Sequence, residues 1–169
     1  VNITPGPGHS FTTVPATIPF GSALDTALGE LPKYRRAARR SHPQDAILPV
    51  IFNDYMDTLE GDPTEAKLLP LIDAAAEVGA EYFCIDAGWY DDTDGWWASV
   101  GDWNPSTARF PHGFSAVLGH IRDRGLIPGL WMEPEVVGVT SQAAQTLPDD
   151  DIITSNGVGI QQRSGIFLD

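Results

Sequence analysis

The chain is poor in cysteine, in basic residues and in long apolar runs. Its single cysteine, Cys84, excludes an intrachain disulfide among the 169 residues. Ten Lys and Arg stand against 23 Asp and Glu, a net charge of −13, and so acidic a chain repels the phosphates of nucleic acids and anionic membranes. No apolar run approaches the ~20 residues that cross a bilayer, and the first residues lack a signal-peptide pattern. We expect a cytoplasmic protein with no nucleic-acid or membrane partner, and homo-oligomerisation is left open.

Several catalytic signatures are missing as well. The four histidines, His9, His42, His112 and His120, lack the spacing of zinc ligands. The acidic run before Gly95 has no glutamate at the closing position of a calcium loop. Neither a G-x-S-x-G nucleophile elbow nor a phosphate-binding glycine loop is present. The sequence therefore predicts no bound metal and no other cofactor.

The first 45 residues differ in pattern from the rest. Residues 1–19 are rich in Pro, Gly and Thr and predict a strand or two in a turn-rich context. A polar linker helix is expected within residues 21–45, over about 22–40, with Pro32 interrupting it. The basic cluster of this helix fits a solvated or acid-paired face better than a binding patch.

A regular pattern begins at Ala46. Three short apolar runs, over 48–52, 82–85 and 127–132, predict strands. Apolar residues at helical spacing predict one helix that ends at Gly79 and a second that ends at Gly125. In the first helix we expect Asp62 to cap the start, Pro63 to occupy the first turn and Glu65 to reach back as in a capping box.

Strands that alternate with helices predict an α/β fold with parallel strands. The strands are continuously apolar, which is typical of a sheet buried on both faces. Farther along, Asn156-Gly157 predicts a tight hairpin turn between two short strands. One more short strand is expected over 166–168. A complete (β/α)8 barrel takes about 250 residues, so this chain is long enough only for part of one.

Polar residues stand where each of the three predicted strands ends. Asn53 and Asp54 follow the first, Asp86 the second and Glu133 the third. In α/β barrels the active site lies at the carboxyl ends of the strands. For any one of these residues the alternative is an acid that caps the following turn. Three strands that place polar groups at one rim favour a binding site.

Aromatic residues gather after the second predicted strand. Four of the five tryptophans are Trp89, Trp96, Trp97 and Trp103, and the fifth, Trp131, lies in the third strand. Sugars combine apolar C–H faces with hydroxyl groups, so flat aromatic rings beside carboxylates suit a sugar site. A small core under a long loop is the alternative for Trp96, Trp97 and Trp103.

Five motifs in order make the sequence similar to a known family. They are Phe52-Asn53-Asp54-Tyr55, Ile85-Asp86-Ala87-Gly88-Trp89, Gly101-Asp102-Trp103, Phe110-Pro111-His112-Gly113 and Gly129-Leu130-Trp131-Met132-Glu133-Pro134-Glu135. Together they resemble the family 36 glycoside hydrolases, chiefly bacterial α-galactosidases. The resemblance implies the end of a β-sandwich over 1–20, a linker helix over 21–45 and the first three βα units of a (β/α)8 barrel over 46–169.

The resemblance also implies roles for individual residues. The positions implied to bind an α-galactoside oligosaccharide are Asp54, Tyr55, Asp86, Trp89, Trp131 and Arg163, with Glu133 and Glu135 as supporting acids. Members of the family retain anomeric configuration, which requires a nucleophile and an acid/base carboxyl. In the family these lie on later strands, the nucleophile in a Lys-x-Asp motif. No such motif occurs here, so we expect both catalytic residues beyond Asp169.

One departure from the family bears on specificity. Many members carry two consecutive Asp residues before Gly-Trp, and here the second is Ala87. Asp54 is a candidate to replace the missing carboxylate from the neighbouring strand. The leading interpretation is α-galactoside hydrolysis. Two alternatives stay open: another α-glycosidase such as an α-N-acetylgalactosaminidase, and a non-catalytic sugar-binding module.

Overall fold

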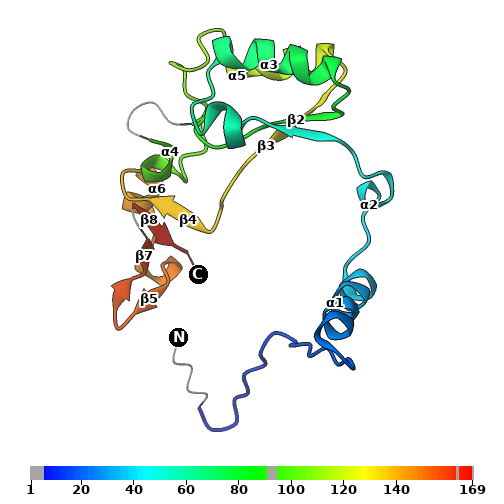
Figure 1. Ribbon diagram of the computed structural model, residues 1–169. Coiled ribbons are helices and arrows are strands. Elements are labelled where there is room, and N and C mark those ends of the chain that lie inside the picture. Colours follow the sequence, from blue (N-terminus) through cyan, green and yellow to red (C-terminus); the bar gives the residue numbers. More distant parts are fainter. Residues whose placement is uncertain (1–5, 91–94, 163, 169) are drawn as a thin grey trace. The chain divides into compact units, whose positions relative to one another are not determined.

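The computed structural model describes residues 6–90, 95–162 and 164–168 and is shown in Figure 1. The chain divides into two compact units, Val1–Leu48 and Pro49–Asp169. Of the helices in the described ranges, none is both long enough and apolar enough to cross a membrane. The fold is mixed α/β, and the parallel β-α units that the sequence predicts lie in the second unit.

The first unit contains two helices, α1 (Leu24–Ala38) and α2 (Gln44–Ile47). The predicted interruption at Pro32 is wrong, because α1 continues through it. Proline removes the N–H that would bond to the carbonyl of Leu28, and on a helix without buried residues water satisfies that carbonyl. The strand expected near the start is not formed in the described residues 6–19, because no neighbouring segment there takes up its hydrogen bonds.

The second unit is built on a three-stranded parallel sheet. Its strands are β1 (Ile51–Asn53), β2 (Tyr82–Ile85) and β3 (Ile127–Leu130), in the order β1-β2-β3. Phe83 is opposite Phe52 on one side and Pro128 on the other. The predicted adjacency and parallel direction are confirmed, and the first and third strands are shorter than the apolar runs that predicted them.

Two helices lie side by side and supply most of the core of this unit (Figure 1). They are α3 (Glu65–Glu77) and α5 (Phe114–Asp123), and both end where the sequence predicts, with Gly79 and Gly125 at positive φ. The fully buried residues of these helices and of β2 are Leu68, Ile72, Ala75, Val117, Ile121, Phe83 and Ile85. Burying about seven such side chains supplies the main driving force for folding this unit.

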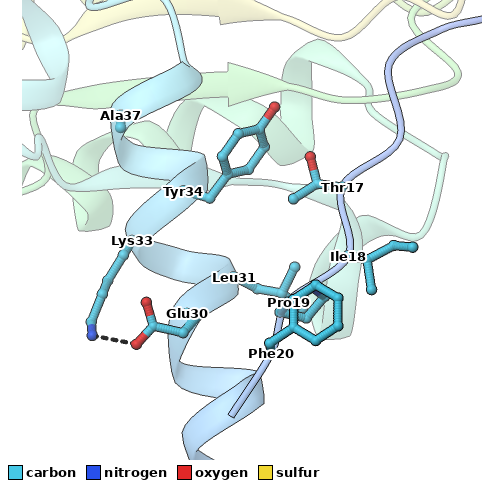
Figure 2. Close-up of a pocket in the computed structure, with 9 residues that line it drawn as sticks. All are labelled: Thr17, Ile18, Pro19, Phe20, Glu30, Leu31, Lys33, Tyr34 and Ala37. Carbon is cyan, nitrogen blue, oxygen red and sulfur yellow. Dashed lines mark hydrogen bonds and ion pairs between the residues drawn. The ribbon is translucent and has the colours of Figure 1, made fainter.

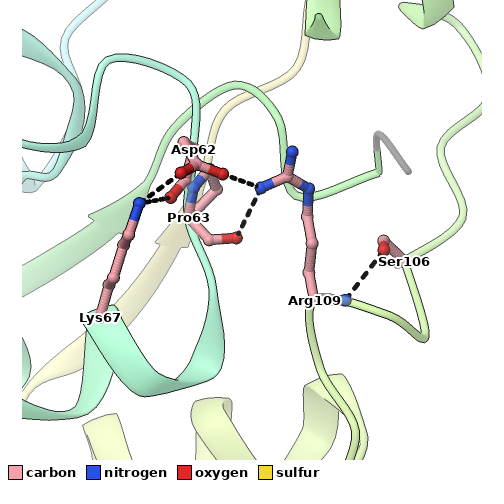
Figure 3. A network of polar contacts seen from close by, with 5 residues as sticks. All are labelled: Asp62, Pro63, Lys67, Ser106 and Arg109. Carbon is pink, nitrogen blue, oxygen red and sulfur yellow. Dashed lines mark hydrogen bonds and ion pairs between the residues drawn. The ribbon is translucent and has the colours of Figure 1, made fainter. Parts of the chain in front are cut away.

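The expected cap of α3 is wrong. The residue before the helix is Thr64, whose side chain makes no capping bond. Asp62 instead binds Lys67 and the guanidinium of Arg109, with a 2.5 Å contact to Nη1 of the latter (Figure 3). Glu65 accepts hydrogen bonds from His112. Contacts to the segment before α5 therefore replace the local capping box, and they join the starts of the two helices.

The expectation of a sheet buried on both faces is also wrong for the described residues. Along β2, Phe83 and Ile85 are fully buried, whereas the alternate residues Tyr82 and Cys84 are only partly buried. On the flanking strands, Ile51 and Ile127 are exposed. Side chains alternate between the two faces of a strand, so an apolar run alone did not show that the second face lacks a covering layer.

Beyond β3 the chain forms small antiparallel sheets. One contains β4 (Val136–Gly138), β8 (Gly165–Phe167) and β7 (Gln161–Gln162). The other pairs β5 (Thr154–Ser155) with β6 (Val158–Gly159). Asn156 and Gly157 between them both have positive φ, as a type I′ turn requires. The predicted hairpin is confirmed, as is the last strand, shifted by one residue.

The described residues of this unit also include the short helices α4 (Trp96–Ser99) between β2 and α5, and α6 (Gln142–Thr146) and η2 (Asp149–Asp151) after β4. The segment η1 (Tyr55–Leu59) after β1 is a turn with non-helical backbone at Met56 and Asp57. The backbone of β4 contacts the loop between β2 and α5, because the N–H of Gly138 donates to the carbonyl of Val100 at 2.7 Å. The loops after β2 and β3 therefore support each other.

Candidate functional site

The polar residues at the ends of β1 and β2 meet at one rim of the sheet. Asn53 is the last residue of β1 and is paired with Cys84, two residues before Asp86. Its amide Nδ2 donates to Oδ2 of Asp86 at 2.6 Å, and its Oδ1 accepts from the N–H of Tyr55 at 2.9 Å. Parallel strands bring their carboxyl ends to the same edge, and the predicted meeting of these two strand ends is confirmed.

Asp54 is the most deeply buried acid of this rim, with 1% of its surface exposed. Its Oδ1 accepts the backbone N–H of Asp86 at 2.7 Å, and its Oδ2 has no hydrogen-bond partner among the described residues. Burial raises the pKa of this carboxyl to about 6, and the nearby Asp86 adds to the rise. A buried oxygen without a partner costs stability.

Asp86 begins the loop after β2. Its Oδ1 accepts the N–H of Ala87 at 2.7 Å, so each of its two oxygens already holds one hydrogen bond. A carboxylate offers about four acceptor positions, so others remain for a ligand. Ala87 itself is 1% exposed. Gly88 follows with φ +96°, and a Cβ there would lie 2.0 Å from the carbonyl oxygen of Gly61, so only glycine fits this turn.

The tryptophans form one connected group of rings. Trp89 stacks near Trp103 and Phe114, with centroids 5.9 and 5.6 Å away. Trp131 meets Trp96 and Trp103 edge-on. At 2% exposure Trp89 lies in the core, and a direct sugar contact by its ring stays a prediction. Trp96, Trp97 and Trp103 are partly buried against the same core.

Trp131 stands at the end of β3, on the same rim as Asp86. Its N–H donates to the carbonyl of Ile85 at 2.9 Å, which extends the β2-β3 pairing by one residue. The indole N–H of Trp89 donates to the carbonyl of Trp131 at 3.1 Å. Buried Trp89 therefore holds the backbone that carries Trp131, whose own ring is only partly buried.

The other predicted site residues differ in their surroundings. Tyr55 is partly buried and meets Trp96 edge-on at 5.9 Å. Glu133 is partly buried while Glu135 is exposed, and burial, followed by the neighbouring Glu135, raises the pKa of Glu133. Arg163 lies outside the described residues, so its predicted place in the site stays a prediction.

Two contributors to this region carry little signal in the sequence. Asn53 was expected only as a residue at the strand end, and the structure shows it bonded to Asp86. Asp102 accepts the N–H groups of Gln142 and Ala143, at 2.7 and 3.0 Å, and thereby holds the loop after β2 to that after β3. Both bonds join segments more than 30 residues apart, which no local pattern reveals.

Hollows are also lined by residues other than those of this rim. One, of about 550 Å³, lies in the first unit between the extended residues 17–20 and α1 (Figure 2). Its two charged side chains, Glu30 and Lys33, bind each other at 2.6 Å. Another, of about 390 Å³, lies at the start of α3 beside Arg109 and His112. In the described ranges no group of three or more His, Cys, Asp and Glu is placed to hold a metal.

The chain matches the family model described as Melibiase over residues 18–169. Among curated proteins it is 34% identical over 115 residues to alpha-galactosidase 1 of Pediococcus pentosaceus. This alignment covers 68% of this chain and 16% of the relative. It is 36% identical over 110 residues to alpha-galactosidase Mel36A of Lactobacillus acidophilus, covering 65% of this chain and 15% of that one. The chain thus spans about a sixth of the length of these relatives.

Solved structures of the same kind superpose on this chain. The GH36 alpha-galactosidase AgaB from Geobacillus stearothermophilus gives a TM-score of 0.66 at 30% identity, covering 77% of this chain and 18% of its own. A variant of AgaA from the same organism, solved in complex with raffinose, gives 0.63 at 28% identity, covering 80% and 18%. Another AgaA variant was solved with stachyose, at a TM-score of 0.63 and 27% identity with the same coverage.

Proposed function

This chain belongs to the Melibiase family, as a homologue of the GH36 α-galactosidases, and we propose that it forms part of a retaining α-galactosidase that hydrolyses terminal α-galactosides of oligosaccharides. We take β1, β2 and β3 as the first strands of a (β/α)8 barrel. The parallel order of these strands and their superposition on a GH36 enzyme support this. Residues 1–20 are then the end of a β-sandwich and residues 21–45 a linker helix.

The observation that carries the proposal is the arrangement around Asp86. Its carboxylate stands at the carboxyl end of the middle strand, held by Asn53 and by the N–H of Ala87. A fixed carboxylate with unused acceptor positions suits the hydroxyl groups of a sugar, which donate charge-assisted hydrogen bonds to it. Substrates in this class of fold bind at the same end of the strands.

Neighbouring residues have supporting roles in this proposal. Trp131 offers a partly buried ring for the apolar face of the sugar, Tyr55 is proposed as a further binding residue, and the role of Arg163 rests on the family resemblance alone. Asp54 holds the backbone of Asp86 and is the candidate to replace the carboxylate that Ala87 lacks. Glu133 and Glu135 support the end of β3. Trp89 fixes the backbone of Trp131. The ligand is an α-galactoside oligosaccharide, such as the raffinose and stachyose bound by two AgaA variants.

Chemistry requires residues that we do not assign within this chain. A retaining glycosidase uses two carboxyl groups about 5–5.5 Å apart, one as nucleophile and one as acid/base. In the proposal Asp54 and Asp86 hold substrate, and the nucleophile comes from a Lys-x-Asp strand, a motif this chain does not contain. We expect the 169-residue chain alone to release no nitrophenol from a nitrophenyl α-galactoside. Turnover above a heat-killed control would mean that acids in this chain react directly.

The proposal is tested in the full-length protein that carries this chain. Asp86→Asn should lower kcat/KM for an aryl α-galactoside by about 10- to 100-fold, the worth of one or two hydrogen bonds to a charged group. The melting temperature should change little, because Asp86 is only partly buried. Asp123→Asn, at the exposed end of α5, is the matched control. Equal kcat/KM in the Asp86 variant and the wild type would remove Asp86 from the pocket.

A second candidate function follows from Ala87. Its small side chain is 1% exposed at the position where many family members carry a second aspartate. With one carboxylate fewer, a neutral substituent such as the acetamido group of an α-N-acetylgalactosaminide meets less charge. Comparing kcat/KM for aryl α-galactoside and aryl α-N-acetylgalactosaminide decides between them. Binding of galactose measured by calorimetry, without hydrolysis of either, would favour a sugar-binding module.

A further inference from the structure

We propose that Asn53 is a positioning residue of the sugar site, holding the carboxylate of Asp86 in the orientation that accepts sugar hydroxyls. This inference rests on the proposed function, in which Asp86 contacts the sugar. In that proposal Asn53 appears only as one of two groups that bond to Asp86, and no contribution to turnover or substrate binding is assigned to it. The argument for it comes from the direction of its two hydrogen bonds.

The orientation of the Asn53 amide is determined by its neighbours. The N–H of Tyr55 lies 2.9 Å from Oδ1 and can only donate, so the oxygen of the amide faces Tyr55. The nitrogen must then face Oδ2 of Asp86, 2.6 Å away, and it donates to the carboxylate. The planar amide of Asn53 thus accepts a hydrogen bond at the end of β1 and donates one to the residue that follows β2.

Two consecutive residues at the end of β1 form hydrogen bonds with Asp86. Asn53 binds its side chain, and Asp54 accepts its backbone N–H at 2.7 Å. The second oxygen of Asp86 is held by the N–H of Ala87. With its main chain and both oxygens restrained, the carboxylate loses little freedom when a sugar binds, which is the benefit of a pre-organised site.

The chemistry of asparagine explains why this residue type suits the position. Aspartate has the same shape and still accepts the N–H of Tyr55, but it places a second carboxylate against Asp86. Alanine removes both bonds and adds no charge. Asn53→Asp therefore keeps the bond to the N–H of Tyr55 and reverses the contact with Asp86.

The test measures kcat/KM for an aryl α-galactoside from pH 4.5 to 8 in the full-length protein, as the ratio of variant to wild type. In Asn53→Asp two carboxyl groups at this distance repel when ionised, so both lose their protons only at the higher pH values. At low pH one shared proton lets position 53 donate to Asp86, as the amide does. At high pH both are charged and repel. We expect a loss of about 10- to 100-fold at pH 8 that shrinks steadily toward pH 4.5.

Two further variants make the result decisive. Asn53→Ala should lose about 10-fold at every pH, chiefly through a higher KM, because it removes the donor without adding a titrating group. Asn156→Asp makes the same chemical change in the β5-β6 turn, where Asp-Gly is also favoured, and should match the wild type. Far-UV circular dichroism checks folding of each variant, and Asn53→Ala decides the matter if Asn53→Asp does not fold.

The inference and the proposed function fail in different ways. A wild type that hydrolyses no α-glycoside, or an Asp86→Asn variant with full activity, overturns the proposed function. If the wild type is active and Asp86→Asn is impaired, a ratio for Asn53→Asp that stays flat with pH overturns the positioning role. Wild-type kcat/KM in Asn53→Ala overturns it as well.

Discussion

The two units of this chain are both rich in apolar residues but use them differently. Unit Val1–Leu48 has no buried residue in its described part, and its exposed apolar side chains include Phe20 at 82% and Leu28 at 52%. Unit Pro49–Asp169 contains the entire described core, including Phe83 and Leu68 at 0%. The first has one long helix and extended chain, and the second has a sheet with helices packed on it.

This difference shows that a helix buries its apolar side chains only where other elements pack against it. Helix α1 has 15 residues and α3 has 13, yet only α3 buries any, because it packs beside α5 and shares a core with β2. Net charge also differs between the two units. Residues 1–48 carry 5 Lys and Arg and 3 Asp and Glu, hence +2, and residues 49–169 carry 5 and 20, hence −15. Acids concentrate in the unit that holds the candidate site.

The largest expected effect compares two phenylalanines. Phe83→Ala should destabilise the second unit by about 3–5 kcal/mol, because it empties a fully buried site beside Phe52. Phe20→Ala should change stability by less than about 0.5 kcal/mol. Urea unfolding followed by tryptophan fluorescence measures this, since all five tryptophans lie in residues 49–169. Similar losses in the two variants would mean that Phe20 is buried in solution.

The second effect concerns Asp54 and pH. The pKa of its buried carboxyl is raised to about 6 in the folded chain, above about 3.9 in the unfolded chain. The folded state therefore favours the protonated form, and its contribution to stability is complete below pH 4 and is lost as pH rises through 6. The difference amounts to about 3 kcal/mol at most.

Asp54→Asn keeps an oxygen for the N–H of Asp86 and removes the titration. Relative to the wild type, its free energy of unfolding should rise between pH 4 and 7, measured by urea unfolding at each pH. A difference that is constant over this range would show that Asp54 is ionised without penalty in the folded chain. A gain in stability at pH 7 would also indicate that this acid is kept for a reason other than folding.

The third effect compares two glycines. Gly88→Ala should destabilise the second unit by about 1–3 kcal/mol, because its φ is +96° and a Cβ would meet the backbone of Gly61. Gly29→Ala lies inside α1 with nothing within 4 Å of its Cβ, and it should stabilise that helix by about 1 kcal/mol. Urea unfolding reads the first, and far-UV circular dichroism reads the second. Loss of helix content in Gly29→Ala would place that residue against another surface.

The smallest effect compares two ion pairs. Asp62 binds both Lys67 and Arg109, the second of them 47 residues away in sequence (Figure 3), and both cations, Lys67 first, lower its pKa. Asp62→Ala should cost up to about 1 kcal/mol, and Glu30→Ala, which frees Lys33 within α1, less than about 0.5 kcal/mol in helix stability. The Asp62 contribution should vanish in 1 M salt and as pH falls below 4. Insensitivity to both would mean that Asp62 acts through backbone geometry instead.

Local patterns predicted the elements but not the contacts that cap and connect them. The stops at Gly79 and Gly125 and the turn at Asn156-Gly157 were predictable, because the conformations they need favour glycine or asparagine. The cap of α3 was not, because Asp62 found partners on another segment. The interruption expected at Pro32 did not occur, since an exposed helix tolerates one missing hydrogen bond.

Some features of the candidate site could likewise be predicted from the sequence, and others could not. Sequence predicted that Asn53, Asp86 and Glu133 follow three parallel strands, because residue type and strand order are local properties. It did not predict that Trp89 is buried while Trp131 is only partly buried, because that depends on which rings pack together.

The sequence by itself determined the three parallel strands, the helices that end at Gly79 and Gly125 and the turn at Asn156-Gly157, and that acids and tryptophans gather at the strand ends. Only the tertiary structure decided that the amide of Asn53 meets Asp86 and that one oxygen of Asp54 is buried without a partner among the described residues. The physical reason is the separation in sequence over which each kind of interaction acts. Backbone preferences act over a few residues, whereas these contacts join atoms 32 and 33 residues apart and exist only once β1 lies beside β2.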